Sequence, residues 1–310
     1  MEIRLYTPAF KTEWDNFVHN SKNGTFLLYR DFIEYHGNRF NDYSLLFYEK
    51  EKLIALMPGH MEDKVFYSHK GLTYGGLIMG AEAKIKDVLS IFEYLTVTFR
   101  HQGIKKIVYK AIPHIYHQQP SEEDLYALFR HNAILTERNI SSTIYLTERL
   151  KYSELRKRGI KKAEKNSLKI EENTDFEGFW GVLTENLQSR YDKQPVHSLK
   201  EIILLKNKFP DNIHLYVAKD NDSIVAGTVV FETKTVAHIQ YIAASAKGKE
   251  LGATDLLIDH IINEAYPDKK YFDYGVSTED NGLHLNENLI SQKEGFGARA
   301  TVYDIYIINL

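Results

Sequence analysis

The chain has 310 residues, 43% of them hydrophobic and 26% charged, with a formal net charge of −3 and no cysteine. This balance excludes a general basic field for DNA or anionic membranes, and the lack of cysteine excludes disulfides, thiolate metal sites and a cysteine nucleophile. The opening residues, MEIRLYTPAFKTEW, lack the apolar stretch of a signal peptide, and no segment approaches the roughly 18 apolar residues of a membrane span. We therefore expect a cytoplasmic protein with two domains, each with a hydrophobic core of its own.

The first half alternates short strands and helices, assigned from the period of its apolar residues. The charged Lys50-Glu51-Lys52 is predicted to be a hairpin turn, and Ser121 to Asp124 a capping box that starts a helix. In chain order, we expect a strand at 3–6, helices at 14–18 and 26–35, strands at 43–49 and 53–61, an interrupted strand at 65–79, a helix at 83–101, a strand at 105–112, a helix at 121–132 and a strand at 141–148.

The second half follows a similar order. Asp175 is predicted to cap a helix that starts after it, Pro210 to stop another, and Asn221-Asp222 to form a tight turn. In chain order, we expect a helix at 152–166, a strand at 168–172, helices at 175–191 and 198–209, strands at 213–220, 224–232 and 235–245, a helix ending near 262, a strand at 270–276, a helix at 285–295 and a strand at 298–308.

The strand–helix–strand order that closes the first half recurs at the end of the second half. Sequence identity between the two segments is low, so the repeat is one of topology and not of motif. Two copies of one α/β unit with a mixed sheet are the simplest interpretation. The predicted domains are residues 1–148 and residues 149–310.

Residues 241–262, YIAASAKGKELGATDLLIDHII, predict a strand, a loop with two glycines and an amphipathic helix. Backbone N–H groups at a helix N-terminus are unpaired and the helix dipole favours an anion, so such a loop can hold a pyrophosphate. An ordinary strand-to-helix connection can have the same composition. The pattern alone leaves both interpretations open.

This segment resembles the acyl-CoA loop of the GNAT acyltransferase fold, which reads Arg/Gln-x-x-Gly-x-Gly/Ala. The matching positions are Lys249, Gly252 and Thr254, with Lys in place of Arg/Gln and Thr in place of the last small residue. Lys-Glu-Gly-Phe at 293–296 is similar to the ending of GNAT domains. The resemblance implies acetyl-CoA or another acyl-CoA as co-substrate and no metal. The residues that it places against CoA are Ile242, Ala243, Ala244, Lys249, Gly252, Ala253 and Thr254.

The whole layout resembles the tandem-GNAT, FemAB-like acyltransferases. Their second domain has a strand ending in Asp-x-Gly, matched by Asp273 and Gly275, and a stretch similar to QKEGFG. It begins with a basic helix, whose characteristic residues are matched by Ser153, Arg156, Ile160 and Ala163. The resemblance implies two closely packed GNAT-like domains, the first a non-catalytic scaffold or acceptor clamp and the second carrying the acyl-CoA site.

The reaction implied by this resemblance is direct attack of a substrate amine on a thioester, with a base that takes the amine proton. Asp273 and Glu279 are the predicted bases, because ligands of open α/β sheets bind at the C-terminal ends of strands. Each has a structural alternative: Asp273 as a residue that binds local backbone N–H groups, and Glu279 as part of a solvated turn. Many GNAT enzymes have a tyrosine that protonates the leaving thiolate, whereas this sequence has Ser291 there, a far weaker acid.

The segment RYDKQPVH, residues 190–197, leads off a helix, and loops on a rigid scaffold often carry binding groups. The resemblance places Arg190, Tyr191 and His197 over the acceptor. Tyr241 and Lys293 are further candidates for contact with the substrate. The alternatives are a plain connector with a helix-ending proline and a tyrosine that only fills the core.

Residues 149–169 contain nine Lys or Arg and only two acids. This segment is either a solvated helix face or a site for a phosphorylated acceptor such as a nucleotide- or lipid-linked sugar. A tRNA partner is disfavoured by the negative net charge. His-Ile-Tyr-His at 114–117 has metal-like spacing, but no third ligand supports a metal site there.

These observations favour an N-acyltransferase that moves an acyl group, expected to be acetyl, from acyl-CoA to the amine of a small molecule, amino sugar or amino acid. A second hypothesis within the enzymes is Fem-type, aminoacyl-tRNA-dependent transfer to a cell-wall precursor. A third, of a different class, is a binding protein that keeps the GNAT fold without activity, which Ser291 and the altered loop both permit.

Overall fold

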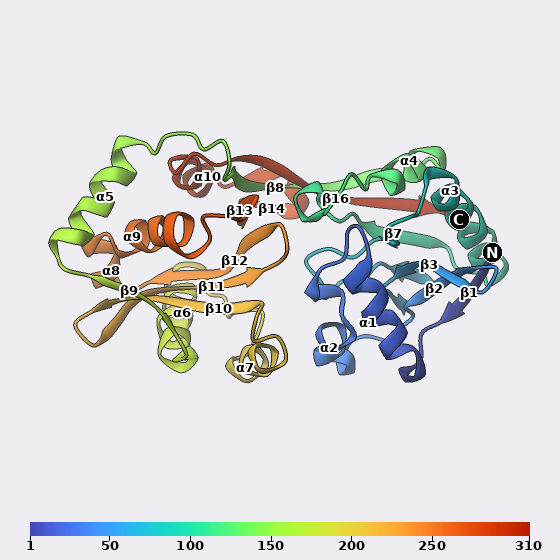
Figure 1. The fold of residues 1–310 in the computed structure, drawn as a ribbon, viewed down its shortest axis with the longest axis horizontal. Coiled ribbons are helices and arrows are strands. Elements are labelled where there is room, and N and C mark those ends of the chain that lie inside the picture. Colours follow the sequence, from blue (N-terminus) through green and yellow to red (C-terminus); the bar gives the residue numbers. More distant parts are fainter. The chain divides into compact units, whose positions relative to one another are not determined.

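The computed structural model describes the backbone of residues 1–310 and every side chain except those of Asn38, Arg190 and Tyr191. It forms two compact units (Figure 1): unit 1 comprises residues 1–140, 278–284 and 301–310, and unit 2 comprises residues 141–277 and 285–300. The predicted boundary near residue 148 assigns the whole C-terminal segment to the second domain. Residues 301–310 instead lie in unit 1, because their strand pairs with the unit 1 strand Lys106–Lys110.

Unit 1 has a sheet of order β1-β2-β3-β6, a row of strands β4-β5-β7-β16-β8, of which β8 contributes its first part, and the two-stranded sheet β14-β15. Helices α3 and α4 pack together. The elements are β1 (Glu2–Leu5), α1 (Lys11–Asn20), α2 (Arg30–Ile33), β2 (Leu45–Glu49), β3 (Lys52–Met57), β4 (His60–Glu62), β5 (Val65–Tyr67), β6 (Ile78–Met79), α3 (Ile85–His101), β7 (Lys106–Lys110), α4 (Glu123–Arg130), β8 (Ile134–Tyr145), β14 (Thr278–Glu279), β15 (His284–Leu285) and β16 (Arg299–Asn309).

Two predictions for unit 1 are wrong. The expected helix at 26–35 is broken at Tyr29, which is extended, and α2 begins where the Asp15 carboxylate accepts the N–H of Arg30 at 2.8 Å. The interrupted strand expected at 65–79 is confirmed as β5 and β6, which belong to different sheets. Ser121 does not cap α4, because its hydroxyl donates to the Gln119 carbonyl at 2.8 Å. The predicted hairpin is confirmed, with a two-residue turn between β2 and β3.

Unit 2 has one mixed sheet of order β8-β13-β12-β11-β10-β9, in which only β12 and β13 are parallel neighbours. The mixed sheet with flanking helices confirms the predicted α/β class. The elements are α5 (Glu154–Lys165), β9 (Lys169–Asn173), α6 (Phe176–Tyr191), α7 (Leu199–Lys208), β10 (Ile213–Asp220), β11 (Ser223–Glu232), β12 (Val236–Ala244), α8 (Ala246–Leu251), α9 (Ala253–His260), a π-helical turn (Ile261–Ala265), β13 (Tyr271–Val276) and α10 (Glu287–Glu294).

Local sequence explains the helix starts in unit 2. The Asp175 carboxylate accepts the N–H of Gly178 at 2.8 Å, which confirms the predicted cap of α6. Ser198 and Glu201 form a capping box at α7, and this helix ends before Pro210 as predicted. The turn between β10 and β11 uses Asn221 at φ +54°, a conformation that Asn tolerates better than most residues.

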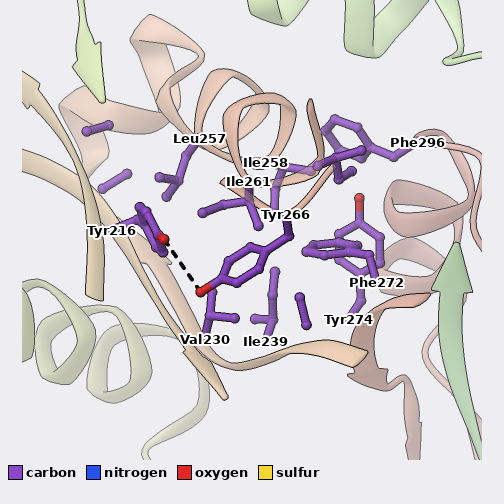
Figure 2. Close-up of a cluster of buried hydrophobic side chains, with 14 of the residues drawn as sticks. Tyr216, Val230, Ile239, Leu257, Ile258, Ile261, Tyr266, Phe272, Tyr274 and Phe296 are labelled. Atoms are coloured by element: carbon purple, nitrogen blue, oxygen red, sulfur yellow. Dashed lines mark hydrogen bonds between the residues drawn. The ribbon is translucent and has the colours of Figure 1, made fainter. Parts of the chain in front are cut away.

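The core of unit 2 lies between α9 and one face of the sheet (Figure 2). Leu257 and Ile258 of α9 are buried with Ile239 of β12 and Phe272 of β13. Below the π-helical turn, the Tyr216 hydroxyl donates to the Tyr266 hydroxyl at 3.5 Å. This apolar layer fixes β12 and β13 on one side, so polar side chains of these strands face the other side.

Candidate active site

The parallel strands β12 and β13 separate in the middle of the sheet. They pair at Val236–Tyr271, Ala237–Phe272 and His238–Asp273, and no later pair joins them in the part of the chain that the structure describes. Beyond that point β12 continues beside β11, and β13 remains beside β8. Where two strands part, the backbone groups of their inner edges are available to a ligand that can form hydrogen bonds to them.

A bulge in β12 aims side chains at this point. Val229 pairs with Tyr241 and Val230 with Ile239, which leaves Gln240 as the extra residue. A bulge re-aims the side chains that follow it, so His238 and Tyr241 share a face of β12 although they are three residues apart. Ile239 belongs to the apolar core on the opposite face.

His238 and Asp273 form a buried pair at the point of separation. The imidazole Nδ1 lies 2.8 Å from the Asp273 Oδ2, and the other carboxylate oxygen accepts from Ser141 at 2.6 Å and Thr143 at 2.8 Å. Asp273 is fully buried. Since the carboxylate only accepts, Nδ1 of His238 carries the proton of this hydrogen bond, and Nε2 is the ring nitrogen not bonded to Asp273.

Hydrogen bonding keeps Asp273 ionised. Burial alone would raise the pKa of this carboxyl, but the hydrogen bond and charge of His238, with the hydroxyls of Ser141 and Thr143, lower the pKa below its usual value. A buried carboxylate with three donors is a poor proton acceptor for an external amine. The predicted base Asp273 therefore lies where it orients His238, and His238 is the residue that the sequence interpretation missed.

Gly275 lies beside the imidazole. Its φ of +75° suits glycine, and a Cβ there would lie 3.4 Å from Cε1 and 4.0 Å from Nε2 of His238. The Asp-x-Gly end of β13 thus supplies both the carboxylate that holds the ring and a residue without a side chain next to it.

Lys293 comes from α10 to the same strand end. Its ammonium donates to the carbonyls of Gly275 at 2.7 Å and Val276 at 3.0 Å, and to the Ser277 hydroxyl at 2.8 Å. Burial lowers the pKa of Lys293 to about 8, against a smaller opposing effect of Asp273. Lys293 therefore fixes the end of β13, and its predicted contact with substrate stays a prediction.

The other two predicted catalytic residues lie elsewhere. Ser291 is exposed on α10 and lines a shallow pocket of about 870 Å³ with Ser153, Arg156 and Arg299, whereas Lys293 is buried. Glu279 is exposed in the two-residue strand β14, which is part of unit 1. The structure does not bring either residue into the His238–Asp273 cluster.

His197 and Tyr241, both predicted to bind substrate, lie together. The backbone N–H of His197 donates to the Tyr241 hydroxyl oxygen at 3.1 Å, and Nδ1 of the same histidine shares a second hydrogen bond with this hydroxyl at 2.5 Å. Trp180 of α6 packs edge-on against Tyr241, with ring centroids 5.2 Å apart. Burial raises the pKa of Tyr241, so its hydroxyl stays protonated. The side chains of Arg190 and Tyr191 lie outside the described part of the chain.

The predicted CoA loop is helical. Ser245 caps α8 by accepting the N–H of Gly248 at 3.1 Å, and Gly252, at φ +80°, joins α8 to α9. Helix α5 lies against this junction, because a Cβ on Gly252 would meet the Gly159 carbonyl oxygen at 2.5 Å. The open strand–loop–helix connection expected at 245–254 is therefore corrected to two short helices covered by α5.

These positions fit CoA only in part. Ile242, Ala243 and Ala244 lie on the stretch of β12 beyond the separation, where backbone groups can meet the amides of a pantetheine arm. At Ala253 and Thr254 the N-terminus of α9 adjoins α5, and the Asp255 carboxylate lies in its first turn, where it would oppose a phosphate. The structure therefore offers no open pyrophosphate cradle at Gly252–Thr254, and Lys249 stays a predicted contact.

Metal sites and membrane-spanning helices are the remaining features that bear on function. Among the side chains that the structure describes, no three His, Asp or Glu residues are arranged to hold one metal ion. Over the described residues, the helices are all too short or too polar to cross a bilayer.

Comparison with known proteins agrees with this architecture. Residues 156–281 match a family model described as an acetyltransferase (GNAT) domain. No curated protein matches the sequence. Among solved structures, FemX has a TM-score of 0.70 at 10% identity, over 100% of this chain and 98% of its own. L-PGS from Bacillus licheniformis has a TM-score of 0.63 at 13% identity, over 95% and 90% of the two chains.

A tandem GNAT protein from the clavulanic acid biosynthesis pathway has a TM-score of 0.51 at 8% identity, over 99% of this chain and 98% of its own. At such identities the likeness concerns the fold alone. It confirms the predicted tandem GNAT-like architecture.

Proposed function

We propose that this chain, which has the Fem-like tandem GNAT fold with a GNAT acetyltransferase domain at residues 156–281, transfers an acyl group to an amine at the separation of β12 and β13. The observation that carries the proposal is the His238–Asp273 pair at the last point where these strands are joined. A histidine held by a buried carboxylate is the arrangement that makes imidazole a directed proton acceptor.

In the proposed reaction, the amine nitrogen attacks the carbonyl carbon of the activated acyl group. The new C–N bond forms as the bond to the leaving group breaks, and Nε2 of His238 accepts the proton that the amine loses. Asp273 stabilises the resulting imidazolium through Nδ1, and the proton passes on to the leaving group or to water. General base catalysis of this kind contributes about 10²- to 10⁴-fold to the rate.

Acyl-CoA is the first candidate donor, with a small-molecule or sugar-linked amine as acceptor. Two observations support this choice: the match to an acetyltransferase family model, and the stretch of β12 at Ile242–Ala244 beyond its pairing with β13. His197, Tyr241 and Trp180 would form a wall on the same face of β12 as His238. A cytoplasmic location is part of this proposal, since acyl-CoA is a cytoplasmic metabolite.

An aminoacyl ester, as in aminoacyl-tRNA-dependent transfer to a cell-wall precursor, is the second candidate donor. One observation favours it: α5 covers the N-terminus of α9, where the GNAT resemblance places the CoA pyrophosphate. An ester donor needs no pyrophosphate cradle at this helix.

Ligand-induced stabilisation separates the candidates. We would measure the unfolding temperature with acetyl-CoA, longer acyl-CoAs, free CoA and charged tRNA. A donor present at about 100 times its Kd stabilises the fold by about 2.7 kcal/mol. A rise with acyl-CoA supports the first donor, and a rise with charged tRNA alone supports the second. No rise with any donor would contradict both.

Mutation of the pair tests the chemistry. His238→Gln should lower kcat by at least about 10²-fold and leave donor-induced stabilisation in place. His214→Gln, on strand β10 of the same sheet, is the matched control and should keep full activity. Full activity of His238→Gln would show that the base is another group or water.

A further inference from the structure

Helix α3 of unit 1 exposes an apolar strip between two opposite charges. Tyr94 and Val97 are 42% and 43% exposed, although they lie in the middle of a 17-residue helix whose other face is fully buried. Glu93 and Arg100 are exposed as well, four residues before and three residues after Val97, so that the three side chains share one side of the helix. Neither charge forms an ion pair within the part of the chain that the structure describes.

Helix α4 packs on α3 and carries two further exposed aromatic side chains, Tyr126 and Phe129, which are 47% and 74% exposed. Its C-terminal end lies against α3, because the rings of His131 and Phe92 have their centroids 6.1 Å apart. The surface formed by Glu93, Tyr94, Val97, Arg100, Tyr126 and Phe129 is called the α3 surface below.

The order of charges along α3 makes this helix complementary to an antiparallel copy of itself. If two copies of α3 lie antiparallel across a two-fold axis near Val97, Glu93 of one copy faces Arg100 of the other, twice per dimer. The apolar side chains then cover one another at the centre, and the ion pairs lie at the rim. A copy shifted by one turn, or a parallel copy, would lose these pairs or oppose like charges.

We infer that the α3 surface is a two-fold contact through which this chain forms a homodimer, closed by reciprocal Glu93–Arg100 pairs around Val97. Aromatic side chains at the centre and arginine at the edge are typical of such contacts. The surface consists of six side chains, so we expect a weak dimer that dissociates at micromolar concentrations. This inference does not depend on the proposed catalytic function.

Sedimentation velocity on the full chain, from about 1 to 200 μM, tests the inference in the range expected for a weak contact. The parent should pass from monomer to dimer as concentration rises. Glu93→Arg and Arg100→Glu should each weaken dimerisation at least tenfold, because each places like charges together twice. The double variant should recover parental dimerisation, since the reversed pair is again complementary.

Controls keep the result specific. Lys161→Glu, a charge reversal on α5 of unit 2, should leave dimerisation unchanged, and Val97→Glu should weaken it. Dimerisation is compared only among variants whose unfolding temperature equals that of the parent. A parent that stays monomeric to 200 μM, or a double variant that stays as weak as the single ones, would overturn the inference.

Discussion

Arg156 on α5 donates to the Asp255 carboxylate on α9 at 2.5 Å, across 99 positions of sequence. The two side chains are only 14% and 13% exposed. Burial raises the pKa of Asp255, and the charge and hydrogen bond of Arg156 act against this rise. The ion pair therefore occupies the helix terminus at which the GNAT resemblance places a phosphate.

Removing one partner of this pair should destabilise unit 2. Arg156→Met leaves the Asp255 carboxylate half-buried without its cation, and we expect a loss of about 1–3 kcal/mol in the free energy of unfolding. Urea unfolding at pH 7 measures it. The double variant Arg156→Met, Asp255→Leu should recover most of the loss, because no unpaired charge remains. Equal stability of the single and double variants would show that the pair contributes nothing.

A methyl group at Gly275 should impair activity more than stability. Gly275→Ala places its Cβ beside the His238 ring, and a left-handed alanine costs about 1–2 kcal/mol. We expect at least about a tenfold loss in kcat/KM from misplacement of reactants. Gly103→Ala is the matched control, since Gly103 has φ +73° and an added Cβ there meets nothing within 4 Å. The two variants should lose similar stability, and only Gly275→Ala should lose activity.

The sequence predicted the elements of unit 2 well because their signals are local. Asp175 and Ser198 cap helices through residues three positions away, so the pattern is visible within one turn. Alternation likewise located the three antiparallel strands from β10 to β12.

The candidate site could not be predicted in the same way, because it depends on register. His238 and Asp273 are 35 positions apart and meet only through the parallel pairing of β12 with β13. The bulge at Gln240, which turns His238 and Tyr241 to one face, leaves no signal in the order of side chains. The one signal of this site in the sequence was an ionisable residue inside an apolar strand, His238 in the segment Val-Ala-His-Ile.

Unit 1 should lose stability in mild acid through a histidine cluster. His60 and His69 are buried with ring centroids 5.4 Å apart, and His36 lies 5.2 Å from His69. Burial and then Lys70 lower the pKa of His60 to about 4, with Glu62 and Asp42 opposing. Burial, then His36 and His60, then Lys110 and Arg30 lower the pKa of His69 to about 2.

The sign of the effect follows from these shifts. Between pH 6.5 and 4 the unfolded chain binds protons at both histidines and the folded chain does not, so stability falls as pH falls. Each histidine lowers the free energy of unfolding by about 1.4 kcal/mol for each unit by which the pH falls in this window. His60→Phe should reduce the slope of unfolding free energy against pH, because about one proton fewer is taken up on unfolding. Urea titrations from pH 7 to 5 measure this slope. An unchanged slope would mean that His60 titrates normally.

The basic face of α5 gives the last prediction. Arg156 forms an ion pair with Asp255, and Lys157 with Glu154 at 2.8 Å. The exposed cations on this helix include Arg158, Lys161 and Lys162. If the acceptor carries a phosphate, these side chains supply charge-assisted hydrogen bonds to it. Replacing all three with Gln should then raise the acceptor KM and leave the donor KM unchanged.

Salt separates this interpretation from a merely solvated helix. Exposed charges are screened over about 8–10 Å at physiological ionic strength, so added salt should raise the acceptor KM of the parent more than that of the triple variant. An equal number of Gln replacements in unit 1, at Lys50, Lys105 and Lys106, controls for net charge. Steady-state kinetics at two ionic strengths provide both measurements. Identical KM values and salt responses in parent and triple variant would assign the basic face to solvent, because a face that binds phosphate must lose affinity when its charges are removed.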